Sequence, residues 1–315
     1  MRAFNVSVEQ ELSATTAPAA ATAARGRQRR HLLGAVCAVV MGLGALTAPA
    51  AHAELADALK RGVLKVATED DYAPFNYIAD GKPTGFHAEL LQDLRKYAQT
   101  KNLKVQQDIL PWTGLLAAVA NSQYDVAFTG ALVTDDRLKA FNFTPPFASA
   151  QHYYVKRAGD KRLGDVATLA GKTVGVQAGS ALLARLPELE KMLAASGGKL
   201  GQVIEYQSYP EAYADLANGR LDYVVNAVIS VNDLVKARPK VFEKGVAVSG
   251  DGFAAWPIAK SSPELLGFMT GFMDDIRASG RLAELQKKWF GEAFPDLPKA
   301  PIRSVEQFHQ LAGIQ

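Results

Sequence analysis

Short apolar runs alternate with amphipathic segments along most of this chain, and this alternation restricts the fold more than any other feature. Residues 63–68 have the composition of a buried strand, and residues 85–101 place Phe86, Leu90 and Leu94 on one helical face. The pattern continues with expected strands at 173–177, 203–207 and 222–225 and expected helices at 112–120, 181–195 and 210–217. Strands that alternate with helices build α/β folds, so we expect an α/β protein.

A six-residue echo indicates two lobes of similar construction. Residues 120–125 (ANSQYD) recur as 217–222 (ANGRLD) at an offset of 97, each time before an apolar strand. This offset is far longer than a solenoid repeat. Extended segments at 151–157 and 252–260 are candidates for crossings between the lobes. Two lobes joined in this way can close over a ligand like a hinge.

The first 53 residues have the features of a secretory signal peptide. Four arginines between residues 25 and 30 precede an apolar run at 32–46, and the small-x-small pattern Ala51-His52-Ala53 follows. The run is too short for the roughly 20 residues that span a membrane. Arg29-Arg30 leaves open a twin-arginine signal, although ordinary export is the favoured interpretation. We expect cleavage after Ala53 and a periplasmic location.

Composition excludes several functions for the remaining chain. Five of the 35 basic and two of the 32 acidic residues lie in the leader, so 30 of each sign remain, which argues against nucleic acid as a partner. The sole cysteine, Cys37, is also in the leader. Common catalytic motifs are absent, and His87 is expected on the surface, while His152 lies in a proposed crossing near the cleft. We therefore expect no cofactor and no metal site, and we do not expect an enzyme.

The stretch at 124–146 contains a candidate anion site. A buried strand at 126–128 runs into the turn Thr129-Gly130-Ala131, and Thr134 is a candidate N-cap with Asp135, Asp136 and Arg137 in the first helical turn. A cation there opposes the helix dipole, but a cation beside free backbone N–H groups suits a bound anion. The alternative is that Arg137 pairs with Asp135 or Asp136 on the surface. Local sequence leaves both interpretations open.

Aromatic residues after the predicted strands are candidates for cleft walls. Tyr72 follows the strand at 63–68, and Trp112 starts a predicted helix. Flat rings bury a large area at low entropic cost, whereas Phe75 is expected in the core. Glu69 directly continues the strand and is expected to point between the lobes.

Motifs spread over the whole segment after the leader resemble those of one family. They are YAPFNY at 72–77, GFHAELL at 85–91, YDVAFTGALVTDDR at 124–137, FTPPF at 143–147, GKTVGVQAGSA at 171–181, LANGRLD at 216–222 and GRLAELQKKWFG at 280–291. In this order and spacing the chain resembles the periplasmic polar amino-acid-binding proteins of ABC importers, the family 3 solute-binding proteins. The resemblance implies a periplasmic-binding-protein-like fold of type II, with two α/β lobes joined by a two-strand hinge. We expect lobe 1 at 54–155 plus 253–315 and lobe 2 at 156–252.

The resemblance assigns ligand contacts to named residues of the first lobe. Arg137 matches the arginine that holds the ligand α-carboxylate in a bidentate pair. Glu69 and Tyr72 match the positions that read the ligand side chain and stack on it, and Trp112 matches the second wall. Gly130 matches a carbonyl that accepts from the ligand ammonium, in the turn that also contains Thr129.

The remaining positions match less evenly. Ser180 and Ala181 match a second-lobe turn whose N–H groups reach the carboxylate. Leu132 stands where the family usually has a hydroxyl side chain. The aspartate that neutralises the ligand ammonium is missing, because Ala227 occupies its position and Asn226 precedes it. The sequence therefore predicts a carboxylate clamp and leaves the amino clamp open.

The resemblance implies the substrate-binding subunit of an ABC transporter, which captures an amino acid or related small carboxylate and presents it to a membrane permease. We expect a monomer. The alternative is a periplasmic enzyme on the same scaffold, similar to cyclohexadienyl dehydratase, with Glu69 as the candidate general acid.

Overall fold

The computed structural model describes residues 54–314, so the expected leader lies outside the described residues. In chain order the elements up to the middle of the chain are α1 (Leu55–Arg61), β1 (Val63–Thr68), β2 (Asp71–Tyr72), β3 (Asn76–Ala79), β4 (Lys82–Thr84), α2 (Phe86–Gln99), β5 (Lys104–Ile109), α3 (Trp112–Ala120), β6 (Val126–Ala127), α4 (Arg137–Ala140), β7 (Phe141–Phe143), β8 (Ala148–Ser149) and β9 (His152–Arg157). The rest are the 3₁₀ helix η1 (Val166–Leu169), β10 (Val174–Gln177), α5 (Ala181–Ala184), α6 (Leu186–Ala195), β11 (Val203–Tyr206), α7 (Tyr209–Ala217), β12 (Tyr223–Ala227), α8 (Val228–Ala237), β13 (Phe242–Ala247), β14 (Phe253–Ala254), β15 (Pro257–Ala259), α9 (Pro263–Ala278), α10 (Arg281–Phe290) and α11 (Val305–Ala312). The elements expected from the sequence are present, with shifts of one to a few residues at their ends.

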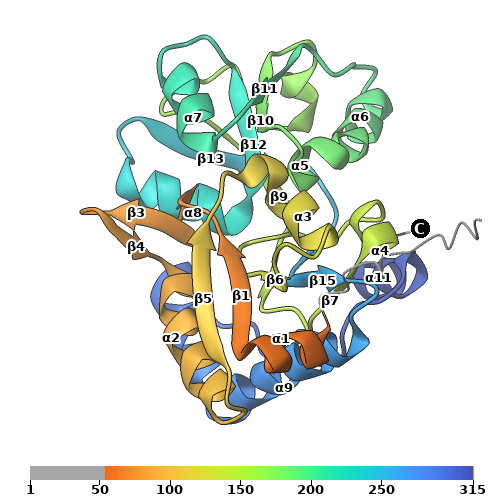
Figure 1. Cartoon of the computed structure of the whole chain (residues 1–315). Coiled ribbons are helices and arrows are strands. Elements are labelled where there is room, and N and C mark those ends of the chain that lie inside the picture. Colours follow the sequence, from red (N-terminus) through yellow and green to blue (C-terminus); the bar gives the residue numbers. More distant parts are fainter. Residues whose placement is uncertain (1–53, 315) are drawn as a thin grey trace, which may run out of the picture. The chain divides into compact units, whose positions relative to one another are not determined.

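Two sheets form the centres of two α/β lobes (Figure 1). The first has the order β5-β1-β6 and is parallel, with Val66 of β1 opposite Val126 of β6. The second has the order β11-β10-β12-β9-β13, in which β9 runs antiparallel to both neighbours. Parallel strands place their carboxyl ends at one edge of a sheet, and that edge is where α/β proteins bind ligands.

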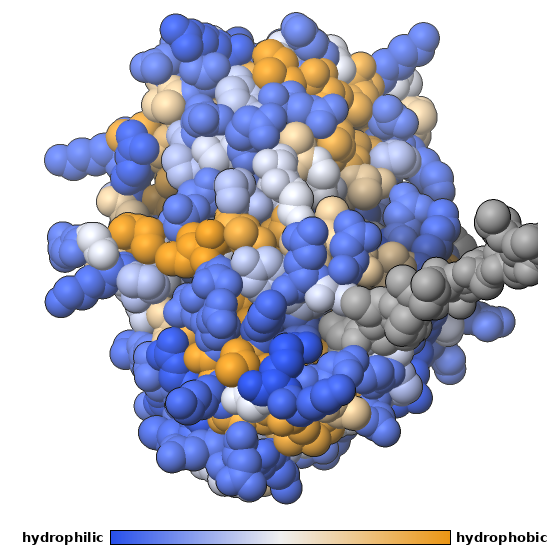
Figure 2. Space-filling model, viewed as in Figure 1, coloured by the Kyte–Doolittle hydropathy of each residue, from blue (hydrophilic) through white to orange (hydrophobic). Residues whose placement is uncertain are grey.

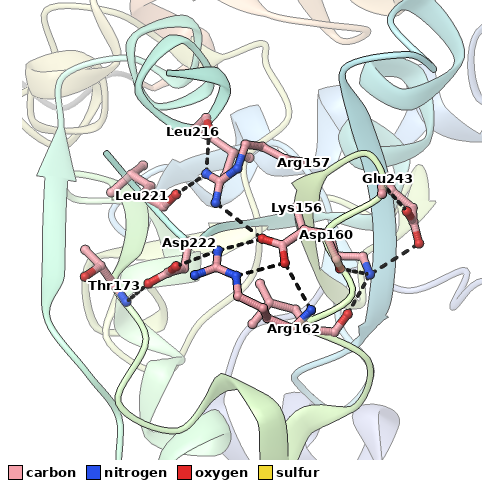
Figure 3. A network of polar contacts seen from close by, with 11 residues as sticks. Lys156, Arg157, Asp160, Arg162, Thr173, Leu216, Leu221, Asp222 and Glu243 are labelled. Atoms are coloured by element: carbon pink, nitrogen blue, oxygen red, sulfur yellow. Dashed lines mark hydrogen bonds and ion pairs between the residues drawn. The ribbon is translucent and has the colours of Figure 1, made fainter. Parts of the chain in front are cut away.

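The echoed aspartates play the same part in both lobes. Asp125 N donates to Lys65 O at 2.9 Å, and Lys65 N donates back to Asp125 Oδ2 at 2.7 Å. Asp222 and Thr173 form the same reciprocal pair, with both hydrogen bonds at 3.0 Å (Figure 3). Arg162 adds an ion pair of 3.1 Å to Asp222. The echo at an offset of 97 residues is therefore a structural repeat, which ties β6 to β1 in one sheet and β12 to β10 in the other.

Strand pairing narrows the predicted position of the crossing between the lobes. Residues 152–157 form β9, which is hydrogen-bonded to β12 and β13 along its length. Just before it, β8 pairs with β14 in a two-stranded antiparallel sheet. This pairing favours a crossing near residues 148–151 and 252–254. The lobe limits at 155 and 252 stay a prediction.

The helices α9 and α10, late in the chain, pack in the first lobe. The helix α9 buries its predicted apolar face completely, including Leu265, Met269, Phe272 and Ile276, and packs against α1 and α10. Gly280 separates α9 from α10 with φ of 76°, a conformation that favours glycine. The predicted helix at 181–195 is divided at Arg185 into α5 and α6.

None of the helices between residues 54 and 314 is long and apolar enough to cross a bilayer. Figure 2 shows a face on which hydrophilic residues predominate and hydrophobic residues gather in small patches.

Candidate functional site

A small cavity between the two lobes brings together most of the predicted site residues. We call it the Arg137 cavity; its lining residues are Glu69, Tyr72, Trp112, Gly130, Leu132, Arg137, Gln177, Ser180, Ala181, Leu182 and Tyr209. They come from the ends of β1 and β10, from β2, from the starts of α3, α4, α5 and α7, and from the turn after β6. The free volume between them is only about 10 Å³, so the two lobes are closed on each other around these residues. Eight of the ten predicted site residues line this cavity; Thr129 and Asn226 lie behind its walls.

Arg137 carries the positive charge of the cavity. Its Nη1 donates to Leu132 O at 2.8 Å, and its Nη2 donates to Gly179 O of the second lobe at 3.1 Å. The guanidinium carbon lies 5.0 Å from the ring centroid of Trp112, within cation–π range. Burial lowers the pKa of Arg137 to about 10, and nearby Tyr72 and Glu69 oppose that shift. The group therefore stays charged at neutral pH.

The alternative that Arg137 forms a surface ion pair is wrong. Asp136 pairs with Lys139 at 2.6 Å, and Asp135 faces His309 at 2.9 Å. The helix α4 begins at Arg137, two residues later than expected, and Thr134 Oγ1 accepts from Arg137 N at 3.2 Å. The two aspartates precede the helix and face solvent. The Arg137 guanidinium pairs with neither of them and lines the cavity instead.

Glu69 supplies a buried carboxyl group at the opposite wall. Thr129 Oγ1 donates to Glu69 Oε1, and Glu69 Oε2 has no hydrogen-bond partner among the described residues. Burial raises the pKa of Glu69 to about 8; the Thr129 hydroxyl lowers it, the Asp71 carboxylate raises it and Arg137 lowers it. Thr129 thus acts on the cavity through Glu69, and this carboxyl can hold or release a proton near neutral pH.

Tyr72 joins the two lobes beside the cavity. Its ring stacks on Tyr209 with centroids 5.7 Å apart, and its hydroxyl donates to Asn226 Oδ1 at 3.2 Å. Asn226 Oδ1 also accepts from Ala227 N at 2.7 Å, while its Nδ2 donates to the hydroxyl of Tyr213 at 2.7 Å. Asn226 thereby makes three hydrogen bonds behind Tyr72, one residue before Ala227.

Small residues set the shape of the cavity. A Cβ on Gly130 would lie 2.8 Å from the rings of Phe75 and Tyr72, so a larger residue would displace the aromatic wall. Leu132 contributes apolar surface, and its carbonyl rather than its side chain holds Arg137. Ser180 caps α5 by accepting from Leu183 N at 3.2 Å.

Sequence reasoning missed or misplaced several buried residues. Tyr209 and Gln177 line the cavity, and the aromatic beside Pro210 at a helix start was an available signal for Tyr209. The expectation that His87 lies on the surface is wrong. His87 is fully buried among aromatic rings, where its Nε2 accepts from Trp256 Nε1 at 2.9 Å. His152 is also buried, and burial lowers its pKa well below the usual value.

Two α/β lobes that meet at a polar, charged cavity define a solute-binding protein of the extracellular type. The chain belongs to the bacterial extracellular solute-binding proteins, family 3, whose pattern matches residues 64–292.

Named relatives agree with this assignment. The L-cystine-binding protein TcyJ of Escherichia coli K12 is 30% identical over 272 residues, which cover 84% of this chain and 96% of the relative. The L-arginine-binding protein of Pseudomonas aeruginosa is 26% identical, covering 72% of this chain and 87% of the relative. The membrane-bound lytic murein transglycosylase F of Photobacterium profundum is 27% identical, but the match covers only 44% of its length.

Solved structures extend the comparison. An ancestral arginine-binding protein bound to arginine has a TM-score of 0.64 and 27% identity over 73% of this chain and 99% of that chain. The ancestral amino acid-binding protein AncCDT-1, described as a precursor of cyclohexadienyl dehydratase, has a TM-score of 0.65 and 23% identity, and covers 75% of this chain and 98% of that one. At that identity the second likeness supports the fold alone.

Proposed function

We propose that this protein is the substrate-binding subunit of an ABC importer that captures an amino acid in the periplasm and delivers it to a membrane permease. The observation that carries the proposal is the charged Arg137, which lies in a cavity lined by both lobes and reaches the second lobe through Gly179. Closure would bury the ligand carboxylate against this guanidinium, and contacts from both lobes would favour the closed state. A monomer suffices for this role.

Glu69 is the proposed partner of the ligand ammonium. Ala227 offers no carboxylate, and a buried ammonium without a counter-charge is costly. Glu69 Oε2 is buried and unpaired in the Arg137 cavity, so it can accept from a cation there. This reading keeps an amino acid as the ligand despite the lost aspartate. The named relatives, which bind cystine and arginine, support the same class.

Ligand identity can be obtained from the purified protein. Mass spectrometry of co-purified small molecules and a thermal-shift panel of amino acids, opines and keto acids should identify carboxylates that raise Tm. The sharpest pair is L-arginine and agmatine, which differ by the carboxylate. The proposal expects that carboxylate-bearing compounds alone stabilise the protein. Equal stabilisation by decarboxylated analogues would contradict it.

A lyase on the same scaffold is the second candidate, and Glu69 is the observation that favours it. A carboxyl with pKa near 8 is protonated at neutral pH and can act as a general acid beside a cationic carboxylate site. The test is incubation with prephenate and with arogenate. Turnover that disappears in Glu69→Gln would establish the enzyme, and unchanged substrate would remove it.

A further inference from the structure

We propose that the ligand site continues past Tyr72 into a second cavity, which receives a cationic group at the far end of an elongated amino acid. This inference rests on the proposed function, because it assumes that the carboxylate end lies at Arg137. We call the second space the tyrosine cavity. Its walls include Asp71, Tyr72, Tyr209, Tyr213, Asn226 and Asp233.

The two cavities share a wall. Tyr72 and Tyr209 line both, so their stacked rings form a wall common to the two spaces. The free volume of the tyrosine cavity is about 310 Å³, and that of the Arg137 cavity is about 10 Å³. The side chain of a long amino acid therefore has room beyond Tyr72 and little room beside Arg137. Tyr72 holds its place through its stack on Tyr209 and one neutral hydrogen bond to Asn226, which a ligand can exchange for its own contacts.

The tyrosine cavity has an excess of negative charge on its walls. Asp71 lies on β2 of the first lobe and Asp233 on α8 of the second, so the cavity has a carboxylate on each side. Burial and the nearby carboxylates of Asp70 and Glu211 raise the pKa of Asp71 to about 6, and burial raises that of Asp233. Neither aspartate has an ion-pair partner within 4.0 Å among the described residues.

The basic side chains near this cavity leave that charge uncompensated. Arg238 lines the cavity but its guanidinium carbon lies over the Phe242 ring, 4.7 Å from the centroid. Lys236 lowers the pKa of Asp233 without reversing its upward shift. The buried Ser230 Oγ on the wall makes no hydrogen bond of ordinary geometry. Two carboxylates, the Ser230 hydroxyl beside Tyr72 and three aromatic rings suit an ammonium or guanidinium group.

The test compares ligand pairs that differ in the far-end charge. Isothermal titration would measure L-arginine against L-citrulline and L-lysine against L-norleucine, with L-cystine as a zwitterionic probe. The variants are Asp71→Asn, Asp233→Asn and their combination. Asp70→Asn is the control, because Asp70 is exposed, adjacent to Asp71 and absent from both cavity walls.

We expect wild-type protein to prefer the ligand with the far-end cation in each pair. The combined variant should weaken that ligand at least tenfold and its neutral partner less than threefold, whereas Asp70→Asn should change neither by more than threefold. Equal affinity within each pair overturns the inference. The inference is also overturned if the tightest ligand has no far-end cation. It is overturned as well if Glu69→Gln lowers the affinity for the cationic ligand and the Asp71 and Asp233 variants do not.

Failure of the proposed function gives a different result. If Arg137→Ala leaves the affinity of every probe unchanged, the carboxylate clamp itself is wrong. Another outcome is that Arg137→Ala weakens binding of all carboxylate probes, while the Asp71 and Asp233 variants change the affinities of both ligands of a pair equally. Only the second cavity is then excluded.

Discussion

The hydroxyl of Tyr72 donates a hydrogen bond of 3.2 Å to Asn226 Oδ1, and this contact joins the segment after β1 to the end of β12. The two residues belong to different lobes and are 154 positions apart. The contact occupies the region where the family resemblance places an aspartate and this chain has Ala227. A neutral bridge between protein groups therefore stands beside the site in place of a charged contact to the ligand.

We predict that Tyr72→Phe weakens ligand binding about fivefold, because the closed state loses one neutral hydrogen bond of about 1 kcal/mol. The ring and its stack on Tyr209 are retained, so the change isolates the hydroxyl. Isothermal titration measures the effect. Tyr154→Phe is the control, since Tyr154 donates a partly buried hydrogen bond to Gly164 O within the second lobe. It should lower Tm and leave affinity within twofold; equal losses in both variants would show that the bridge has no role in closure.

Ligand affinity should rise with pH as Glu69 loses its proton. In the ligand-free closed cavity the pKa of Glu69 is about 8, so below that pH binding of a cation must expel a proton. Affinity should therefore increase by up to tenfold per pH unit between about 6 and 8 and level off above 8.

Titrations in two buffers with different ionisation enthalpies would detect the released proton directly. Glu69→Gln should bind more weakly and show no such release, since the amide keeps the hydrogen bond from Thr129 without a titrating group. A wild-type affinity that stays flat from pH 6 to pH 8 would contradict the assignment of Glu69 to the ligand cation.

The buried His87 should make the fold sensitive to acid. Its pKa is lowered to about 3 by burial, against an unfolded value of 6.5, so it favours the folded state above pH 6.5 and this contribution is lost as pH falls. Between pH 7 and pH 5 the wild type should lose about 2 kcal/mol more than His87→Gln, at 1.36 kcal/mol per pKa unit.

Urea unfolding at the two pH values measures this difference, and groups common to both proteins cancel. Glutamine can still accept from Trp256 Nε1, so the variant should fold. Parallel pH dependence in the two proteins would show that His87 does not carry the effect.

Much of the fold follows from local patterns in the sequence. The strand at 63–68, the helix face from Leu265 to Ile276 and the break at Gly280 depend on periodicity and backbone freedom, which the sequence contains directly. The echo of Asp125 in Asp222 also carried correct information, because each aspartate satisfies the backbone of the neighbouring strand.

Features that depend on tertiary contacts could not be predicted in the same way. The burial of His87 depends on Trp256, 169 residues away, and nothing in its local sequence reports that partner. The role of β9 as a sheet strand depends on pairing with β12 and β13, although an extended segment was correctly expected there. The surroundings of Asp71 likewise arise from α7 and α8, which reach it only in the folded chain.

If Arg137 holds the ligand carboxylate, its removal should weaken carboxylate ligands selectively, and one titration series measures this. The tightest carboxylate ligand and its decarboxylated analogue would be titrated into wild type and Arg137→Met, with Tm recorded for both proteins. Two charge-assisted hydrogen bonds of about 1.5 kcal/mol each predict a loss on the order of a hundredfold for the carboxylate and little change for the analogue. An affinity for the carboxylate that stays within threefold of wild type, in a variant that remains folded, would contradict the account.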